Sequence, residues 1–492
     1  MTDLLITLAF IGFLAFGLVS PFFLSLGYVW VDTFYPQFVA RGMLGSVPVS
    51  FIMGAAAVGS YLLMDRRSPP RMGLLFALYI ILAAWITLTT TWAIVPGAAW
   101  GKWDVSIKTL LFAAFIPFVI RSRIQIEAFL QVLLFSTAAH LLPWGAKTFL
   151  TGGGYDQSLG LLDSNQTPLS ESSVVSAACI MLVPLLVVLA RHNRIIPPGR
   201  LPRLLFYGLI VNFLIGSVGT FARTGLVALA VMGSGMLWRS KRKAGFAVAG
   251  VVALGIMFAV TSDKWTARVS TISDYQTEGS ALVRTLVWQW TWDFAKEHPL
   301  GGGFEVYMTN RLVLPMTGPD GEAIIQNGRA FHNIFFAVLG EHGYPGLAMY
   351  LSIMGLSFLG LQATRRTLRG LPEHAWCYEM AGALQISLAT LLASANFVDI
   401  SFNGLLWEML ALSVCLREYA RRVVGAGKVP LAHQDFVVRR PANGVVATPQ
   451  ARLSVSAITP PVAGSAMFAH ARGPAADPAV RRNDTGRRMP PQ

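Results

Sequence analysis

The sequence predicts an all-α membrane protein, a helical bundle of about twelve spans. Hydrophobic residues make up 54% of the chain and charged residues only 13%, and the mean hydropathy is +0.54. A soluble chain with that balance would expose an apolar surface. Apolar windows of about 20 residues, the length that crosses the hydrocarbon core, recur along the sequence. The 13 Trp and 12 Tyr fit the same class, because their amphipathic rings favour the headgroup level.

The apolar windows give the candidate spans in order. They are 4–31, 47–64, 72–96, 107–120, 125–145, 171–190, 202–218, 221–239, 243–261, 334–363, 378–397 and 402–418. The first window is long, and Pro21 is expected to divide it into two pieces. Only Met1-Thr2-Asp3 precedes its apolar residues, with no basic region or cleavage site, so we expect a retained span and not a removed signal peptide.

Lysine and arginine set the predicted orientation. The strongly basic loops each follow an even-numbered window and are predicted to share one side; they are 65–71, 121–123, 191–203, 239–243 and 365–369. The positive-inside rule makes that side cytoplasmic, together with both termini. The same placement accounts for the net charge of +14, so nucleic-acid binding is not expected.

Four regions follow from this topology. Residues 1–261 and 334–420 form the two parts of the membrane bundle, and 262–333 is one large periplasmic segment with short amphipathic helices and the active site. Residues 421–492 are rich in Pro, Ala, Gly and Arg and are expected to form a disordered cytoplasmic tail. The three cysteines lie in or beside apolar windows, which indicates no disulfide framework or metal cluster.

Arg223 is the first candidate for chemistry. It lies in a very short outward turn between the windows 202–218 and 221–239. A guanidinium stays charged and is costly within hydrocarbon, so it should face the bundle interior, water or a bound anion. The structural alternative is an interfacial arginine that reaches to the headgroups.

Arg284 is the second candidate, near the start of a predicted amphipathic helix over 284–298 with Ser280 as its N-cap. A cation gains nothing from the helix dipole there, whereas an anion would be held by Arg284 and by the free amides. This favours a phosphate ligand over a purely structural role. Gly302 and Gly303 follow the helix, either to let a ligand approach the backbone or as a flexible turn.

His332 precedes the window 334–363 and is predicted to lie at the outer membrane interface near a helix N-terminus. That position disfavours the imidazolium and leaves a neutral ring that can accept a proton at pH 7. Arg329 is an extra cation nearby. Glu341 follows within the helix, where it either orients other groups or has a structural role.

Several catalytic motifs do not occur in the sequence: the Asp-x-Asp pair that holds a metal on a nucleotide sugar, the phosphate-binding loop with Gly-Lys-Ser/Thr, His-Glu-x-x-His and Gly-x-Ser-x-Gly. Metal catalysis and ATP hydrolysis are therefore disfavoured. The mechanism that remains is stabilisation of a negative charge by arginine side chains, together with one general base.

These segments together resemble the O-antigen ligase and polymerase superfamily of bacterial envelope glycosyltransferases. The residues that carry the resemblance are 221–225, Arg284 with 292–304, and 331–347. Residues 151–154 and 162–165 look like those of the O-glycosylation ligases associated with exosortase. The resemblance covers the chain up to its tail.

The resemblance implies an inner-membrane enzyme, without a cofactor or metal, that takes a glycan from undecaprenyl diphosphate on the periplasmic face. The glycan passes to a hydroxyl of an acceptor lipid, protein or polysaccharide. By the family pattern Arg223 and Arg284 hold the diphosphate, and His332 activates or positions the acceptor. The physical argument agrees, because forked guanidinium groups match phosphate and stabilise charge on a departing diphosphate.

Three alternatives stay open. A repeat-unit polymerase of the same superfamily uses another lipid-linked glycan as acceptor, and the sequence does not separate it from a ligase. A transporter or flippase for lipid-linked glycans would need ionisable groups near mid-bilayer and usually repeat symmetry, neither of which is convincing here. An envelope assembly scaffold would need His332 only for stability.

Overall fold

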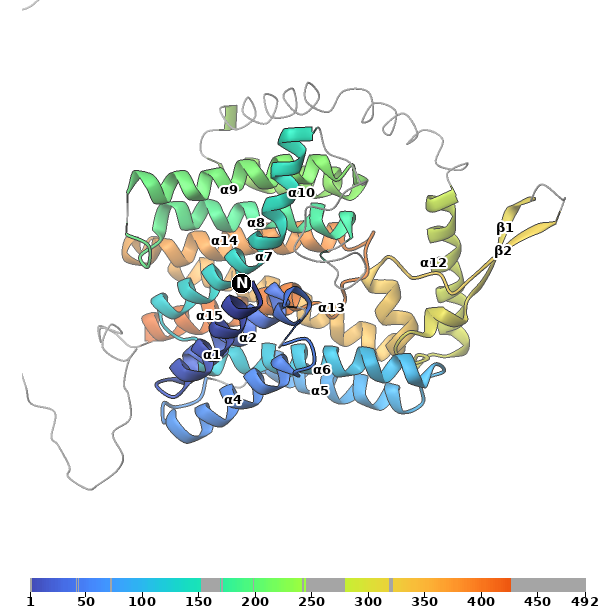
Figure 1. Cartoon of the computed structure of the whole chain (residues 1–492), viewed down its shortest axis with the longest axis horizontal. Coiled ribbons are helices and arrows are strands. Elements are labelled where there is room, and N and C mark those ends of the chain that lie inside the picture. The colour runs from blue at the N-terminus through green and yellow to red at the C-terminus, as the bar shows by residue number, and fades with distance from the viewer. Residues whose placement is uncertain are drawn as a thin grey trace, which may run out of the picture. The chain divides into compact units, whose positions relative to one another are not determined.

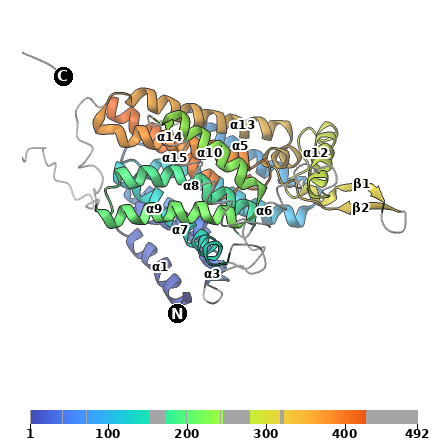
Figure 2. The same ribbon diagram turned by 90° about the horizontal axis from the view of Figure 1, so that it is seen from above.

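Long helices form a bundle, and a two-stranded hairpin lies at one end of it (Figures 1 and 2). The computed structural model describes residues 2–40, 42, 44–70, 73–151, 169, 171–197, 199–240, 243–244, 279–317 and 322–425. The elements are α1 (Thr2–Gly17), α2 (Pro21–Phe34), α3 (Pro36–Val39), α4 (Val49–Met64), α5 (Leu74–Thr91), α6 (Pro96–Val119), α7 (Arg123–Thr151), α8 (Ser172–His192), α9 (Arg200–Gly219), α10 (Arg223–Arg239), α12 (Gly279–Glu297), the 3-10 turn η2 (Val306–Thr309), β1 (Arg311–Thr317), β2 (Ala323–Asn327), α13 (Ile334–Leu368), η3 (Pro372–His374), α14 (Ala375–Ser394) and α15 (Gly404–Gly425).

The predicted windows coincide with helices wherever the structure describes them. Window 243–261 falls almost wholly outside the described residues, and so does the predicted tail beyond Gly425. The first window is divided as predicted, because α1 ends at Gly17 and Pro21 is the first residue of α2. Ser20 caps α2 by accepting a hydrogen bond from the Phe22 N–H at 3.3 Å.

Five of the described helices are long and apolar enough to cross a bilayer: α5, α7, α8, α9 and α13. The chain is therefore an integral membrane protein. Most residues of α8 and α14 are buried, so these two helices lie inside the bundle. The expected number of about twelve spans stays a prediction.

The structure corrects three predicted boundaries. Residues 97–106, predicted to be an outward loop, belong to α6, which starts with Pro96 at its first turn. Helix α12 begins at Gly279, so Ser280 lies inside the helix and is not its N-cap. Helix α15 runs to Gly425, so residues 421–425 are helical and not part of a tail. In each case polar or charged residues that the hydropathy pattern places outside a helix belong to it.

A short hairpin adds two strands to an architecture that otherwise agrees with the predicted all-α class. Strands β1 and β2 pair antiparallel with Arg311 opposite Asn327 and Val313 opposite Ile325. Leu312 is buried while its neighbours Arg311 and Val313 are exposed, which is the two-residue period of a strand. The polar segment therefore contains a hairpin as well as the predicted helix.

The predicted basic loops meet at one end of the bundle, here called the basic end. Arg121 donates to the Ser68 carbonyl at 2.6 Å, and Arg123 donates to the His192 carbonyl at 2.6 Å. Three further contacts connect the remaining loops to α14: His192 with Glu379 (3.1 Å), Arg239 with Gln385 (2.7 Å) and Arg365 with Tyr378 (3.1 Å). The loops that the sequence groups on one side thus lie together, whichever face of the membrane that side is.

Candidate functional site

Helix α12 and the start of α13 pack together at the other end of the bundle, here called the site end (Figures 1 and 2). The Trp288 indole N–H donates to the Phe331 carbonyl at 2.9 Å. The Trp288 ring also stacks on Phe336, with 5.5 Å between ring centroids. Arg284 is four residues before Trp288 and therefore shares its helix face, one turn away. The contact that fixes Phe331 thus brings Arg284 toward the next residue, His332.

The backbone of His332 is held in a strained conformation by its neighbours. Its φ is 46°, in the left-handed region that non-glycine residues seldom adopt. Asn333 caps α13 by accepting hydrogen bonds from the N–H groups of Phe335 (2.8 Å) and Phe336 (3.2 Å). The Ile334 N–H donates to the carbonyl of Ala395, at the end of α14, at 3.0 Å. Strain of this kind persists only where the surroundings fix it, and it is concentrated at functional sites.

The imidazole of His332 is half-buried and biased toward its neutral form. Burial lowers its pKa below the usual range, and the charges of Arg284 and Arg329 lower it further, while Asp399 opposes them. The sequence argument expected a neutral ring because of the helix N-terminus. In the structure, burial and the nearby cations lower the pKa of His332 and so favour the same neutral ring. A neutral imidazole at pH 7 can accept a proton.

Arg223 lies at the site end as well. Helices α10 and α14 run antiparallel, since Arg239 at the end of α10 bonds Gln385, and Gly235 faces Ile386. The start of α10 is about 24 Å away along its axis, beside the end of α14. That places Arg223 at the end where Asp399 follows α14.

The start of α8 links the two predicted arginines. A Cβ on Gly225, in the first turn of α10, would lie within contact distance of the Ser176 hydroxyl of α8, so α10 begins directly against α8. Glu171 immediately precedes α8, and the charge of Arg284 acts on its carboxylate. Arg223 and Arg284 therefore approach the same short region from α10 and from α12.

A cluster around Lys102, which sequence reasoning missed, completes the charged groups of the site end. The Lys102 ammonium lies 2.8 Å from Glu341, 3.2 Å from Glu305 and 3.5 Å from Asp399. Glu341 is fully buried and also accepts a hydrogen bond from the Glu305 N–H at 3.0 Å. Asp399 joins this cluster to His332, because its charge acts on the imidazole. The signal available in the sequence was a lysine in a segment predicted to face outward with few other cations.

The Gly302-Gly303 turn packs against a kink in α13. Gly343 has a φ of 66°, and Pro345 has no N–H, so the carbonyls of Gly340 and Glu341 lack their partners within the helix. The N–H groups of Gly302 and Gly303 fill both places at 2.9 Å. This close backbone contact accounts for the glycines, whose amides are engaged with protein. Their predicted role toward a ligand stays a prediction.

Arg329 is exposed at the base of the hairpin. Its guanidinium donates to Gln326 at 2.7 Å, and its main chain bonds the Asn310 side chain in both directions, at 2.7 and 3.0 Å. Its charge reaches His332, and its position favours a supporting role for it.

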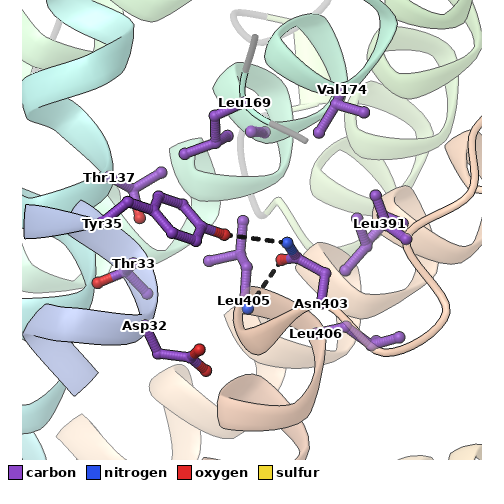
Figure 3. Close-up of a pocket in the computed structure, with 12 residues that line it drawn as sticks. Asp32, Thr33, Tyr35, Thr137, Leu169, Val174, Leu391, Asn403, Leu405 and Leu406 are labelled. Carbon is purple, nitrogen blue, oxygen red and sulfur yellow. Dashed lines mark hydrogen bonds between the residues drawn. The ribbon is translucent and has the colours of Figure 1, made fainter. Parts of the chain in front are cut away.

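An apolar pocket lies next to the site between α2, α7, α8, α14 and α15 (Figure 3). It is a narrow pocket, lined mainly by aliphatic residues such as Leu169, Val174 and Leu391. Asn403 spans its floor, donating to the Tyr35 hydroxyl at 3.2 Å and accepting from the Leu405 N–H at 3.0 Å. The pocket puts apolar space within the bundle beside the charged groups.

Comparison with known proteins gives two family matches. Residues 208–351 match the family model described as O-Antigen ligase, and residues 1–194 match a family of unknown function, DUF5935. No curated protein matches the chain. All of the predicted site residues lie within the first match, Lys102 and Glu171 lie within the second, and Asp399 lies outside both. The chain is thus similar to O-antigen ligases over the segment that carries the predicted site, which supports its place in the O-antigen ligase superfamily.

Proposed function

We propose that the protein transfers a glycan from undecaprenyl diphosphate to an acceptor hydroxyl, at the site end of the bundle. The observation that carries this proposal is the placement of Arg284 beside a half-buried His332 whose pKa is lowered by burial and by that arginine. The match to the O-antigen ligase model supports a glycan-processing membrane enzyme of this class. We place the site end in the periplasm, because the basic end has the cation-rich loops of a cytoplasmic face.

The reaction follows from the chemistry of the groups at the site. The acceptor oxygen forms a bond to the anomeric carbon while the bond from that carbon to the diphosphate oxygen breaks, with inversion. The electron pair remains on the diphosphate, where Arg284 and Arg223 stabilise the growing negative charge more than in the bound donor. The acceptor proton passes to the neutral imidazole of His332.

The Lys102 cluster acts on this site through position. Its ammonium is already held by Glu305, Glu341 and Asp399, so we assign the phosphate contact to the arginines. Glu341 is then the residue that anchors Lys102 from α13. The adjacent apolar pocket has the chemistry that the first units of a polyprenyl chain require.

The acceptor class is the finer part of the proposal. We favour a ligase, and within it the exosortase-associated subgroup, on the residues 151–154 and 162–165 that carry that resemblance; the structure describes only Thr151 of these. A polymerase would use the same donor chemistry and another lipid-linked glycan as acceptor. Loss of a polymerase leaves single repeat units in the cell, whereas loss of a ligase leaves long chains on the carrier lipid.

A transfer assay in lipid nanodiscs tests the proposal directly. The full chain is supplied with undecaprenyl-diphosphate-linked glycan and an acceptor extract, and release of undecaprenyl diphosphate and formation of product are followed by mass spectrometry. Arg284→Ala and His332→Ala should each lower transfer by at least about a hundredfold while the protein stays folded and inserted.

Two matched controls isolate position from residue type. Arg311→Ala removes an exposed arginine of β1, and His298→Ala removes an exposed histidine just after α12. Both should keep wild-type transfer. Normal transfer by Arg284→Ala or His332→Ala would reject the site, and glycan movement across vesicles without any covalent product would identify a transporter.

A further inference from the structure

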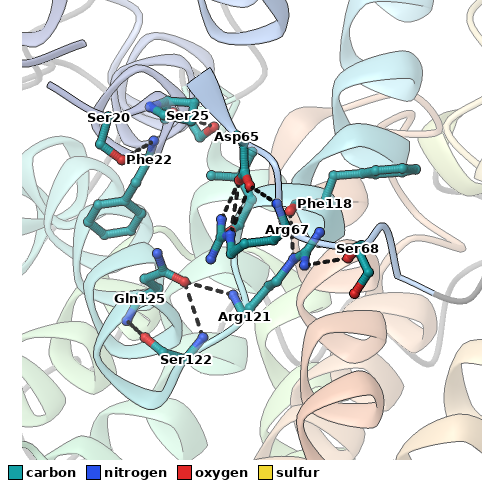
Figure 4. Close-up of polar contacts among 12 residues, drawn as sticks. Ser20, Phe22, Ser25, Asp65, Arg67, Ser68, Phe118, Arg121, Ser122 and Gln125 are labelled. Carbon is teal, nitrogen blue, oxygen red and sulfur yellow. Dashed lines mark hydrogen bonds and ion pairs between the residues drawn. The ribbon is translucent and has the colours of Figure 1, made fainter. Parts of the chain in front are cut away.

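The interior of the bundle contains a buried carboxyl group, Glu408 on α15, that lacks a partner. Its side chain is only 1% exposed, and neither carboxyl oxygen has a hydrogen-bond partner among the described residues. A buried acid at the basic end is different, because the Asp65 carboxylate is held there by the guanidinium of Arg67 at 2.6 Å (Figure 4). Burying an acid without such a partner is costly, so Glu408 is expected to have a ligand.

A second acid lies next to Glu408, on α2. The carboxylate of Asp32, near the end of α2, lies against Gly404 at the start of α15, where a Cβ would overlap it (Figure 3). Tyr28 is one turn before Asp32 on α2, and Glu408 is one turn after Gly404 on α15. The charges of Asp32 and Glu408 both act on the Tyr28 hydroxyl. The two turns therefore face each other, with the helices antiparallel.

Tyr28 adds an independent buried group that lacks a partner. Its ring stacks on Phe112 of α6 with 3.6 Å between ring centroids, which fixes the direction of the side chain. Its hydroxyl is buried and forms no hydrogen bond within the described part of the chain. Thr109, one turn before Phe112 on α6, places its hydroxyl 3.5 Å from both carboxylate oxygens of Asp32. Oxygen atoms from α2, α6 and α15 thus converge on one region of the interior.

Negative charge exceeds positive charge in this region. Lys108 acts on Asp32, but its ammonium already pairs with the exposed Asp104 at 2.5 Å. The charge that acts on Glu408 is that of Asp32, which has the same sign. Protonation would remove the charge of Glu408 but would leave its O–H, like that of Tyr28, with no acceptor among the described groups. A bound cation satisfies both the charge and the open oxygen atoms.

We propose that a single Na⁺ ion binds between α2, α6 and α15. Its ligands are side-chain oxygens of four residues: Asp32, Glu408, Tyr28 and Thr109. Carboxylate and hydroxyl oxygens are the kind of ligand that hard cations take. Lys108 offsets part of the charge on Asp32, so the charge that remains calls for a monovalent ion. Ionisable side chains inside a membrane bundle commonly mark ion sites. This site shares no residue with the glycan-transfer site.

Sodium binding is measured on the full chain in detergent, by thermal unfolding and by equilibrium binding of radioactive sodium. The protein is prepared in choline chloride at mildly alkaline pH, where protons compete least, and Na⁺ replaces choline at constant ionic strength. Wild type should bind about one Na⁺ per chain, and its unfolding midpoint should rise by roughly 3 °C near saturation. Glu408→Gln keeps the shape of the side chain without its charge, so it should fold in choline and lose the response to Na⁺.

Tyr28→Phe keeps the stacked ring and removes only the hydroxyl, so it should weaken Na⁺ binding about tenfold. Tyr79→Phe is the matched control. Tyr79 of α5 has another buried hydroxyl that lacks a partner among the described residues, and its ring packs edge-on against Trp407. Its removal should leave the affinity for Na⁺ unchanged.

Equal unfolding midpoints in Na⁺ and in choline would mean that the acids hold protons or water, and would overturn the proposal. A response to Na⁺ that survives Glu408→Gln would also reject it, as would equal losses in Tyr28→Phe and Tyr79→Phe. A larger response to Mg²⁺ than to Na⁺ would contradict the assignment of a monovalent ion.

Discussion

The two ends of the bundle use cationic side chains in different ways. At the basic end Arg121 and Arg123 bind main-chain carbonyls of neighbouring loops, and Arg239 and Arg365 bind side chains of α14. These contacts connect one loop or helix to the next. At the site end Lys102 is surrounded by carboxylates, and Arg284 acts on a half-buried histidine. The number of cations in the loops is enough to identify the basic end from the sequence. At the site end, the proposed function depends on which partner each of a few charged side chains has.

Removing Lys102 should have the largest effect on stability. Lys102→Met leaves Glu341 fully buried without its cation and places it close to Glu305 and Asp399, so it should cost roughly 3 kcal/mol of unfolding free energy. Arg67→Met at the basic end breaks a partly exposed pair and should cost at most about 1 kcal/mol. Thermal unfolding in one detergent compares them. Similar losses in both variants would remove the contrast between the ends.

Replacing Arg284 by lysine should have the next largest effect, on catalysis. An ammonium keeps the charge but not the forked contact to phosphate, so Arg284→Lys should lower kcat/KM by about ten- to a hundredfold. Arg311→Lys on the exposed strand β1 should leave kcat/KM unchanged. Full activity of Arg284→Lys would mean that the site needs only a positive charge at this position and not the forked contact.

A smaller effect is expected on the pH profile. Because the pKa of His332 is lowered in the folded protein, its neutral form persists as the pH falls below the usual histidine range, and kcat/KM should fall only at the lowered pKa. Arg329→Gln removes one of the charges that lower this pKa. The acidic limb of kcat/KM should then move to higher pH, whereas Arg311→Gln should not move it. A shift to lower pH in Arg329→Gln would contradict the electrostatic argument.

Chelation should have no effect at all if arginine alone neutralises the leaving diphosphate. Transfer measured in nanodiscs with excess EDTA should equal transfer in buffer. Loss of transfer that added Mg²⁺ or Mn²⁺ restores would show that a cation shares the work assigned to Arg223 and Arg284.

Most helices were predictable, because an apolar window of span length has few alternatives in a bilayer. Proline was informative at position 21, where its ring fits the first turn of a helix and breaks the one before. The errors came where polar residues lie within helices, as in α6, or where a short strand pairs only with its neighbour, as in the hairpin. Period and hydropathy carry little signal in either case.

The candidate site was predictable by residue type but not by partner. Arg223, Arg284 and His332 stand out because the segments predicted to face outward contain few cations and histidines. Asp399 and Lys102 do not stand out, since nothing in their local sequence shows that they lie 3.5 Å apart. Contacts between residues about 300 positions apart depend on how α6, α13 and α14 pack.

The sequence by itself determined the membrane class, the positions of most described helices and the grouping of the basic loops, because hydropathy and charge act locally along the chain. Only the tertiary structure decided that Trp288 holds Phe331, that the glycine turn satisfies the kink in α13, and that Lys102 balances Glu341. These are pairings between distant segments. They exist because buried carbonyls and charges must find partners wherever the packed helices bring them.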